Sequence, residues 1–158
     1  MKGEIKVKSL ILALALPLAA GGLAAFLTKD SMIMFKVLQK PPLSPPGWLF
    51  PVAWTILYIL MGIASYLVWT ADVSAARKER ALTVYIMQLA ANFIWPLIFF
   101  DMELYLLAFI WLIVLWLLAA ACTVLFWYIA KKAGKLMLPY MLWLSFAAYL
   151  NFGIWLLN

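Results

Sequence analysis

The chain has 158 residues, of which 69% are hydrophobic and only 11% are charged, and its mean hydropathy is +1.06. A soluble domain usually carries about 25% charged residues, so this chain has too little polar surface to enclose a soluble core. The absence of histidine and the single cysteine exclude imidazole ligation, an intramolecular disulfide and a Cys-based metal site. No metal or cofactor is predicted. The net charge of +6 lies in short clusters between apolar runs, which is typical of membrane topology signals and not of a nucleic-acid-binding face.

Five continuous apolar runs follow one another, each close to the roughly 20 residues that cross a bilayer as a helix. Barrel strands would be about ten residues long, with alternating polarity. The sequence therefore predicts an all-α integral membrane protein, a five-transmembrane-helix bundle that forms one domain over residues 1–158. The predicted spans are 9–27, 48–71, 81–100, 104–130 and 136–157.

The first run admits a second interpretation. A basic start followed by an apolar stretch that ends in small residues resembles a signal peptide, whose removal would leave four spans. The run is longer than a typical signal-peptide core, which favours retention as a helix. Gly21 and Gly22 would then allow a neighbouring helix to approach closely.

The segment 28–47 is the one long predicted loop, and it is rich in proline. Because proline fixes φ and lacks an N–H donor, the proline-rich part should be extended and stiff. It suits either a linker or a lid over one mouth of the bundle. The residues of the predicted lid are Pro41, Pro42, Pro45 and Pro46.

Nine tryptophans divide into two groups. Those near span ends fit the aromatic belts at the membrane interfaces: Trp48, Trp69, Trp127 and Trp155. The others lie deeper, where an indole N–H needs a partner or a cavity: Trp54, Trp95, Trp111, Trp116 and Trp143.

Three spans each place aromatic and uncharged polar residues on one helical face, by steps of three or four. The faces are Trp54, Tyr58, Met61, Gly62 and Ser65 in the second span, Gln88, Asn92 and Trp95 in the third, and Trp143, Ala147 and Asn151 in the fifth. Any one amide is explained by a hydrogen bond between helices. The three faces together favour a pocket for a flat, hydrophobic ligand. They do not suit an ion path, which needs intramembrane charge or unwound backbone, although the amides leave transport of a small polar solute open.

Hydrolytic or redox catalysis finds little support. The chain has no histidine, no carboxylate inside a span and no phosphate-cradling loop. Ser65, Ser145 and Cys122 have no base within reach by sequence.

Basic residues are distributed unevenly between the two predicted faces of the membrane. One face receives nine, namely Lys2, Lys6, Lys8, Arg77, Lys78, Arg80, Lys131, Lys132 and Lys135. The other receives three, namely Lys29, Lys36 and Lys40. The tally predicts that the N-terminus is inside and the C-terminus outside.

Three spaced motifs resemble the TspO/MBR family of tryptophan-rich sensory proteins, which includes the mitochondrial translocator protein or peripheral benzodiazepine receptor. The first motif runs from Lys40-Pro41 through Pro45-Pro46, Phe50-Pro51-Val52, Trp54-Thr55, Leu57-Tyr58 and Met61-Gly62. The second is Ala91-Asn92 with Trp95 and Phe99-Phe100. The third is Leu138-Pro139-Tyr140, Trp143, Ala147, Leu150-Asn151 and Trp155.

The resemblance implies a five-helix bundle, often a homodimer, that binds porphyrins and, in animal members, cholesterol and benzodiazepine-type ligands. Carried over by position, the pocket residues are Trp54, Tyr58, Asn92, Trp95, Trp143 and Ala147, under the proline-rich loop. Some members are linked to light-dependent porphyrin breakdown, for which Trp54 and Trp143 would be the reactive residues.

The chain departs from the family pattern in the loop and at the end of the fifth span. Phe35-Lys36 stands where the family often has Trp-Tyr, and Leu43 where a tryptophan is common. No Lys or Arg follows Tyr149, so the cholesterol motif of animal members is incomplete.

The expected function is therefore a receptor, sensor or transporter for porphyrins, surrounded by membrane lipid, in a bacterial cell membrane, or in the mitochondrial outer membrane if the source is eukaryotic. Two alternatives stay open: an enzyme that degrades the porphyrin in light, and a stress-adaptor protein whose pocket holds lipid. The sequence does not rank sensing against transport.

Overall fold

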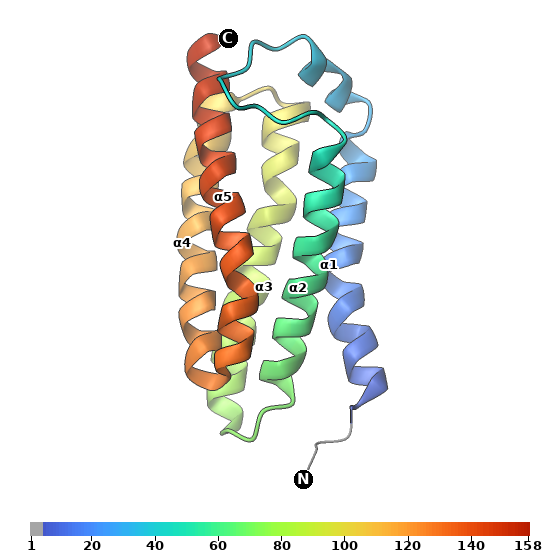
Figure 1. Ribbon diagram of the computed structural model, residues 1–158, viewed down its shortest axis with the longest axis vertical. Helices are drawn as coiled ribbons and strands as arrows, with labels where there is room; N and C mark the ends of the chain where they lie inside the picture. Colours follow the sequence, from blue (N-terminus) through green and yellow to red (C-terminus); the bar gives the residue numbers. More distant parts are fainter. Residues whose placement is uncertain (1–4) are drawn as a thin grey trace.

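The computed structural model describes residues 5–158, which form a bundle of five long helices (Figure 1). Their bounds are α1 Val7–Thr28, α2 Leu49–Trp69, α3 Ala75–Pro96, α4 Tyr105–Ile129 and α5 Lys131–Leu157. A 3₁₀ helix, η1 Ser31–Lys36, follows α1, and a π-helical turn, η2 Leu97–Asp101, continues α3. Each of the five long helices of the described chain is long and apolar enough to cross a membrane. The predicted class is confirmed.

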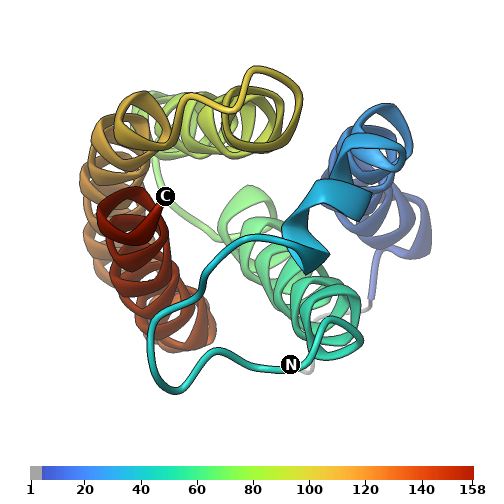
Figure 2. The same ribbon diagram turned by 90° about the horizontal axis from the view of Figure 1, so that it is seen from above.

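The helices are arranged in a closed ring. Going round it, α1 packs on α2, α2 on α5, α5 on α4, α4 on α3, and α3 back on α1 (Figure 2). We call the end that carries residues 29–48 the lid end, and the end that carries residues 70–74 and Ala130 the basic end. Helix α1 begins at the basic end and α5 finishes at the lid end (Figure 1).

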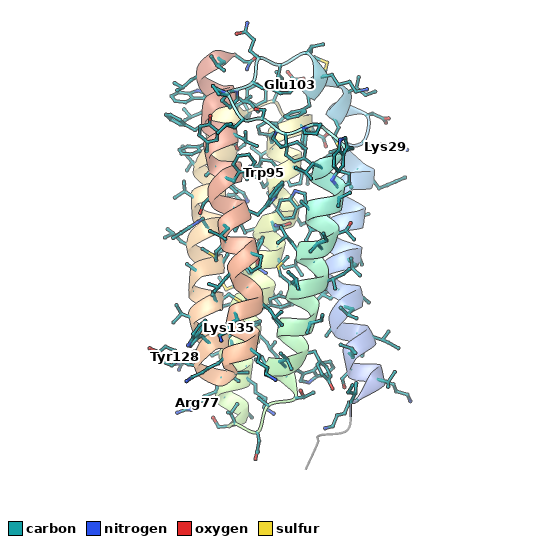
Figure 3. All side chains as sticks on the ribbon, viewed as in Figure 1. Lys29, Arg77, Trp95, Glu103, Tyr128 and Lys135 are labelled. Carbon is teal, nitrogen blue, oxygen red and sulfur yellow. The ribbon has the colours of Figure 1, made fainter. Side chains whose placement is uncertain are left out.

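The outer surface of the ring is apolar. Leu12, Ile56, Ile110 and Leu142 come from four different helices, and each is more than half exposed. Charged side chains lie at the ends of the bundle, as Figure 3 shows for Lys29 and Glu103 at the lid end and for Arg77 and Lys135 at the basic end. A soluble protein does not expose so much contiguous apolar surface. The helices therefore face lipid, and the chain is an integral membrane protein.

Two helices begin earlier than their apolar runs. Helix α3 starts at Ala75, so its first turns include Arg77 and Arg80, and α5 starts at Lys131. Hydropathy marks only the part of a helix that lies in hydrocarbon, whereas Lys, Arg and Glu are themselves good helix formers. The expected loop before the fifth span is reduced to Ala130, in an extended conformation (φ −147°, ψ 109°).

The four tryptophans expected near the membrane interfaces lie at or close to helix ends, and all are exposed: Trp48, Trp69, Trp127 and Trp155. Their contact with lipid headgroups stays a prediction.

Glycines allow close approach at particular points. A Cβ added to Gly21 would overlap the ring of Tyr58, whereas one added to Gly22 would meet nothing within 4 Å. The prediction of a close approach is therefore right for Gly21 and wrong for Gly22, which points away from the other helices. Gly62 of α2 faces the backbone of α1, where a Cβ would lie 2.9 Å from the Ala13 carbonyl oxygen and 2.9 Å from the Leu14 Cα.

The α1–α2 contact gives a first prediction. Gly62→Ala should destabilise the bundle by about 1–3 kcal/mol, since the added methyl meets backbone atoms that cannot move aside as a flexible side chain would. The measurement is the thermal unfolding midpoint in detergent. Gly22→Ala is the matched control and should leave the midpoint unchanged or slightly raised. Equal midpoints for the two variants would contradict the close approach of α1 and α2.

Candidate ligand-binding site

The ring of helices encloses a cavity of about 500 Å³ in its lid-end half. Its walls come from α1, α2, α3, η2 and α5, and its roof comes from the segment between α1 and α2. Figure 3 labels Trp95, which lies within this half of the bundle. The six residues predicted to bind a ligand all line this one cavity: Trp54, Tyr58, Asn92, Trp95, Trp143 and Ala147.

The side walls are aromatic. Trp54 stacks on Tyr58, with ring centroids 5.5 Å apart and an interplanar angle of 26°. Trp143 stands almost perpendicular to Trp54, at 6.4 Å and 84°, and it also meets Phe50 edge-on at 6.0 Å. Trp95 stacks on Phe99 at 5.1 Å and 27°. The cavity therefore offers flat surfaces in two nearly perpendicular orientations.

A chain of hydrogen bonds, which we call the floor network, begins at two cavity residues, Tyr58 and Asn92, and continues into the core behind them. The Tyr58 hydroxyl donates to Asn92 Oδ1 (2.8 Å), Asn92 Nδ2 donates to the Tyr140 hydroxyl (3.0 Å), and that hydroxyl donates to Gln88 Oε1 (2.8 Å). The remaining Gln88 amide group contacts the sulfur of Met61 at 3.7 Å. All five side chains are buried, so this network joins α2, α3 and α5 where no water is available.

A second amide fixes the lid-end wall. Asn151 Oδ1 accepts the indole N–H of Trp95 (3.1 Å), and Asn151 Nδ2 donates to the Tyr105 carbonyl (2.8 Å). Asn151 thus holds the Trp95 ring at a set angle and ties α5 to α3 and α4. The role is structural, although Asn151 also lines the cavity.

Asn92 and Trp143 differ in how far the protein satisfies their hydrogen-bonding groups. Asn92 was predicted to line the pocket, and its oxygen and its nitrogen each have a protein partner. One N–H and one lone pair of that amide remain. The indole N–H of Trp143, in contrast, is buried without any partner. Trp143 therefore carries the fully unsatisfied donor of this wall.

The roof differs from the predicted lid. Met32, Phe35 and Lys36 of the η1 helix line the cavity, together with Ser44 and Gly47. The four predicted lid residues, Pro41, Pro42, Pro45 and Pro46, lie outside the cavity wall. Sequence reasoning missed η1, because the proline run dominates the composition of the loop.

The proline run fastens the roof to α5. Pro41 packs against Gly153, where a Cβ would overlap its ring. The Pro42 carbonyl accepts the Tyr149 hydroxyl (2.7 Å). Gln39 exchanges two backbone hydrogen bonds with the Asn158 side chain, of 3.0 and 2.8 Å. The prolines therefore act as a strap that positions the roof.

Several residues in or behind the cavity wall were not predicted from spacing. Phe35 and Lys36, the pair that departs from the family pattern, both line the roof, and Phe50 lies on the α2 wall. Tyr140 is fully buried behind the floor, four residues after Leu136 and three before Trp143, so helical spacing from Trp143 would have found it.

Two of the deep tryptophans lie away from the cavity. Trp111 donates to the Ala91 carbonyl (2.8 Å), and Trp116 donates to the Ser145 hydroxyl (2.9 Å). Both satisfy their indole N–H by joining neighbouring helices, so their depth reflects helix packing.

The fold and the site define a five-helix integral membrane protein with an aromatic cavity under the loop between α1 and α2. Residues 13–156 match the sequence profile of the TspO/MBR family, and the chain belongs to that family. It is 35% identical to the tryptophan-rich protein TspO of Archaeoglobus fulgidus, over 98% of this chain and 99% of the relative. It is 34% identical to the protein of the same name from Chlorobaculum tepidum, over 100% and 99% of the two chains. It is 36% identical to the human translocator protein, over 82% and 78%.

The floor network gives a second prediction. Tyr140→Phe should destabilise the protein by about 1–3 kcal/mol, since it leaves Asn92 and Gln88 with unpaired polar groups in hydrocarbon. The thermal midpoint in detergent measures this effect. Tyr128→Phe removes the same hydroxyl from a side chain that is 82% exposed, and it should leave the midpoint unchanged. A Tyr140→Phe midpoint equal to that of Tyr128→Phe would contradict the bracing role of the network.

Proposed function

We propose that the protein is a membrane receptor or sensor that binds a porphyrin, or a related flat hydrophobic ligand, in the cavity beneath the loop. The observation that carries the proposal is the wall made by Trp54, Tyr58 and Trp143, whose large flat rings line the cavity. A cavity of about 500 Å³ lies within the range of roughly 300–1,000 Å³ for small-molecule sites. The relatives' names, which include a sensory protein and a translocator, agree with ligand capture in a membrane.

Apolar burial supplies the affinity in this proposal. A tetrapyrrole presents two wide faces, which suit stacking against the Trp54–Tyr58 pair and edge contact with Trp143. The Trp143 ring, which stands almost perpendicular to Trp54, then limits where the edge of the ligand can lie. The floor amides act mainly by holding Tyr58 in place. Neutral benzodiazepine-type molecules fit the same chemistry.

The roof adds one charge. Lys36 lines the cavity at the lid end, where the membrane meets water. A porphyrin carries its propionate carboxylates on one edge. When that edge faces Lys36, the apolar rings of the porphyrin lie between Trp54 and Trp143. The ligand would therefore lie with its acidic edge toward the loop.

The aromatic wall gives a third prediction. Trp54→Phe combined with Trp143→Phe should weaken protoporphyrin IX binding by roughly tenfold, since two aromatic contact surfaces shrink. Binding is followed by quenching of the remaining tryptophan fluorescence. The control is Trp127→Phe with Trp155→Phe, which changes two exposed indoles outside the cavity. Unchanged affinity in the Trp54/Trp143 variant would show that the cavity is not the porphyrin site.

The charge at the roof gives a fourth prediction. Lys36→Gln should weaken binding of protoporphyrin IX about fivefold, and should leave binding of its dimethyl ester unchanged, because the ester has no carboxylate. Lys29→Gln, which removes a charge at the same end outside the cavity, is the control. An equal loss for acid and ester would assign Lys36 to packing and would contradict the proposed orientation.

A second candidate function is light-dependent breakdown of the bound porphyrin. It is favoured by the contact between Trp54 and Trp143, since both are oxidisable rings on the cavity wall. This function requires protein-dependent loss of the Soret band with a defined product, which slows in the Trp54/Trp143 variant. Bleaching at the same rate in that variant excludes it. A lipid-filled stress adaptor would instead show no saturable porphyrin binding.

A further inference from the structure

The roof of the cavity has two parts that differ in how they are attached. The strap holds the second part to α5 through Gln39, Pro41 and Pro42. The first part is η1, which extends from the end of α1 over the ring (Figure 2). In the described chain, the hydrogen bonds of residues 31–36 stay within residues 30–37, and none of the η1 residues is buried. Side-chain contacts alone therefore hold η1 down, and it can move while the strap stays in place.

One side chain of η1 makes most of these contacts. Phe35 lines the cavity, and its ring meets Phe50 edge-on at 5.7 Å and 83°. It also contacts two rings of η2, Phe100 at 6.1 Å and 70° and Phe99 at 6.5 Å and 54°. Phe50 belongs to α2, and η2 continues α3. The Phe35 ring therefore spans the roof between α2 and η2.

A lysine from the fastened part of the roof holds that ring. Lys40 Nζ lies 4.6 Å from the centroid of the Phe35 ring. A cation at this distance is attracted by the electrons of the ring. Lys40 stands between Gln39 and Pro41, which are both residues of the strap, so its backbone is tied to α5. Lys40 thus links the movable η1 to the fixed strap, and it does so without lining the cavity.

A second contact of the same kind lies on the outer surface, where it spans nothing. Lys29 Nζ lies 4.5 Å from the centroid of the Phe26 ring. Phe26 is 63% exposed, and neither residue lines the cavity. The two pairs share their chemistry and differ in their position. The Lys29–Phe26 pair is therefore a matched control for the Lys40–Phe35 pair.

We propose that Phe35 is the gate of the cavity and that Lys40 keeps this gate closed. When the ammonium group leaves the ring, η1 lifts and takes Phe35 away from Phe50 and η2, so that the cavity opens to water at the lid end. The proposal rests on the ligand-binding function proposed above and adds how a ligand is admitted. Lys40 and Phe35 set the rates of entry and release, whereas the aromatic wall sets the affinity.

The first test needs no porphyrin. It uses the full chain with Cys122→Ser, which removes the buried native thiol, and Ala147→Cys, which places a thiol on the cavity wall. The reagent is hydroxyethyl methanethiosulfonate, which is neutral, so that a lost lysine does not itself attract or repel it. Lys40→Gln should raise the rate of thiol modification about threefold, as the loss of one exposed cation–π contact predicts. Lys29→Gln should leave the rate unchanged, and equal rates in the two lysine variants would overturn the gate.

A second pair of variants tests whether Lys40 acts through the ring. Phe35→Leu, in the same thiol background, should also raise the modification rate. Adding Lys40→Gln to Phe35→Leu should then have no further effect, because the cation has no ring to contact. A full further threefold increase in the combined variant would contradict the role of Lys40 as the residue that holds Phe35.

The third test measures ligand exchange with the dimethyl ester of protoporphyrin IX, which has no carboxylate for a lysine to attract. Stopped-flow quenching of tryptophan fluorescence gives its association and dissociation rates. In Lys40→Gln both rates should rise about threefold, with the affinity unchanged, because Lys40 lies outside the cavity wall. A changed affinity at unchanged rates would overturn the gate. If the unaltered protein shows no saturable binding while the thiol rates differ as expected, the porphyrin proposal fails and the gate is supported.

Discussion

The requirement that polar groups be paired inside the membrane determines how this bundle is built. Asn92 meets it by accepting from Tyr58 and donating to Tyr140, so one amide joins three helices. Such bonds between helices are modest in energy, but removing one partner leaves a polar group in hydrocarbon. The network therefore fixes the rotation of each helix more than it adds stability. That rotation aims Trp54 and Trp143 into the cavity, and it turns Gly62 toward α1.

The cavity stays open because neighbouring residues hold the aromatic rings of its wall in place. The hydroxyl of Tyr58 is hydrogen-bonded to Asn92, and its ring packs directly against Gly21. The ring therefore cannot move toward α1. Trp95 is fixed in the same way by Asn151. A Cβ at position 21 would push Tyr58 into the cavity. Small residues on α1 and amides on α3 and α5 thus keep open a space that large aromatic side chains would otherwise fill.

Helical spacing identified the inward faces because the 3.6-residue period is a local property of the chain. Trp54, Asn92 and Trp143, which it put on those faces, line one cavity. It could not show that Asn92 already has two partners while Trp143 has none, because this depends on side chains of other helices.

The roof of the cavity was missed for a related reason. Phe35 and Lys36 reach the cavity through a short 3₁₀ helix, whose position is set by the strap between Pro41 and Gly153, and no local pattern encodes that contact. Helices α3 and α5 begin at Ala75 and Lys131, before the predicted spans, because hydropathy reports solvent preference, not helix formation.

Among the described residues, two buried side-chain donors have no partner, Trp143 Nε1 and the Tyr85 hydroxyl. Each borders a hollow, one inside the ring at the lid end and one outside it at the basic end. In a soluble protein, water would satisfy such groups. Inside a bilayer it does not, so each unpaired donor is a local cost that the packing around it has to offset. The two surroundings differ in shape as well: flat indole and phenol rings enclose the first, whereas alanine and leucine form the narrow second. The flat walls of the first hollow are those that suit the planar ligand proposed above.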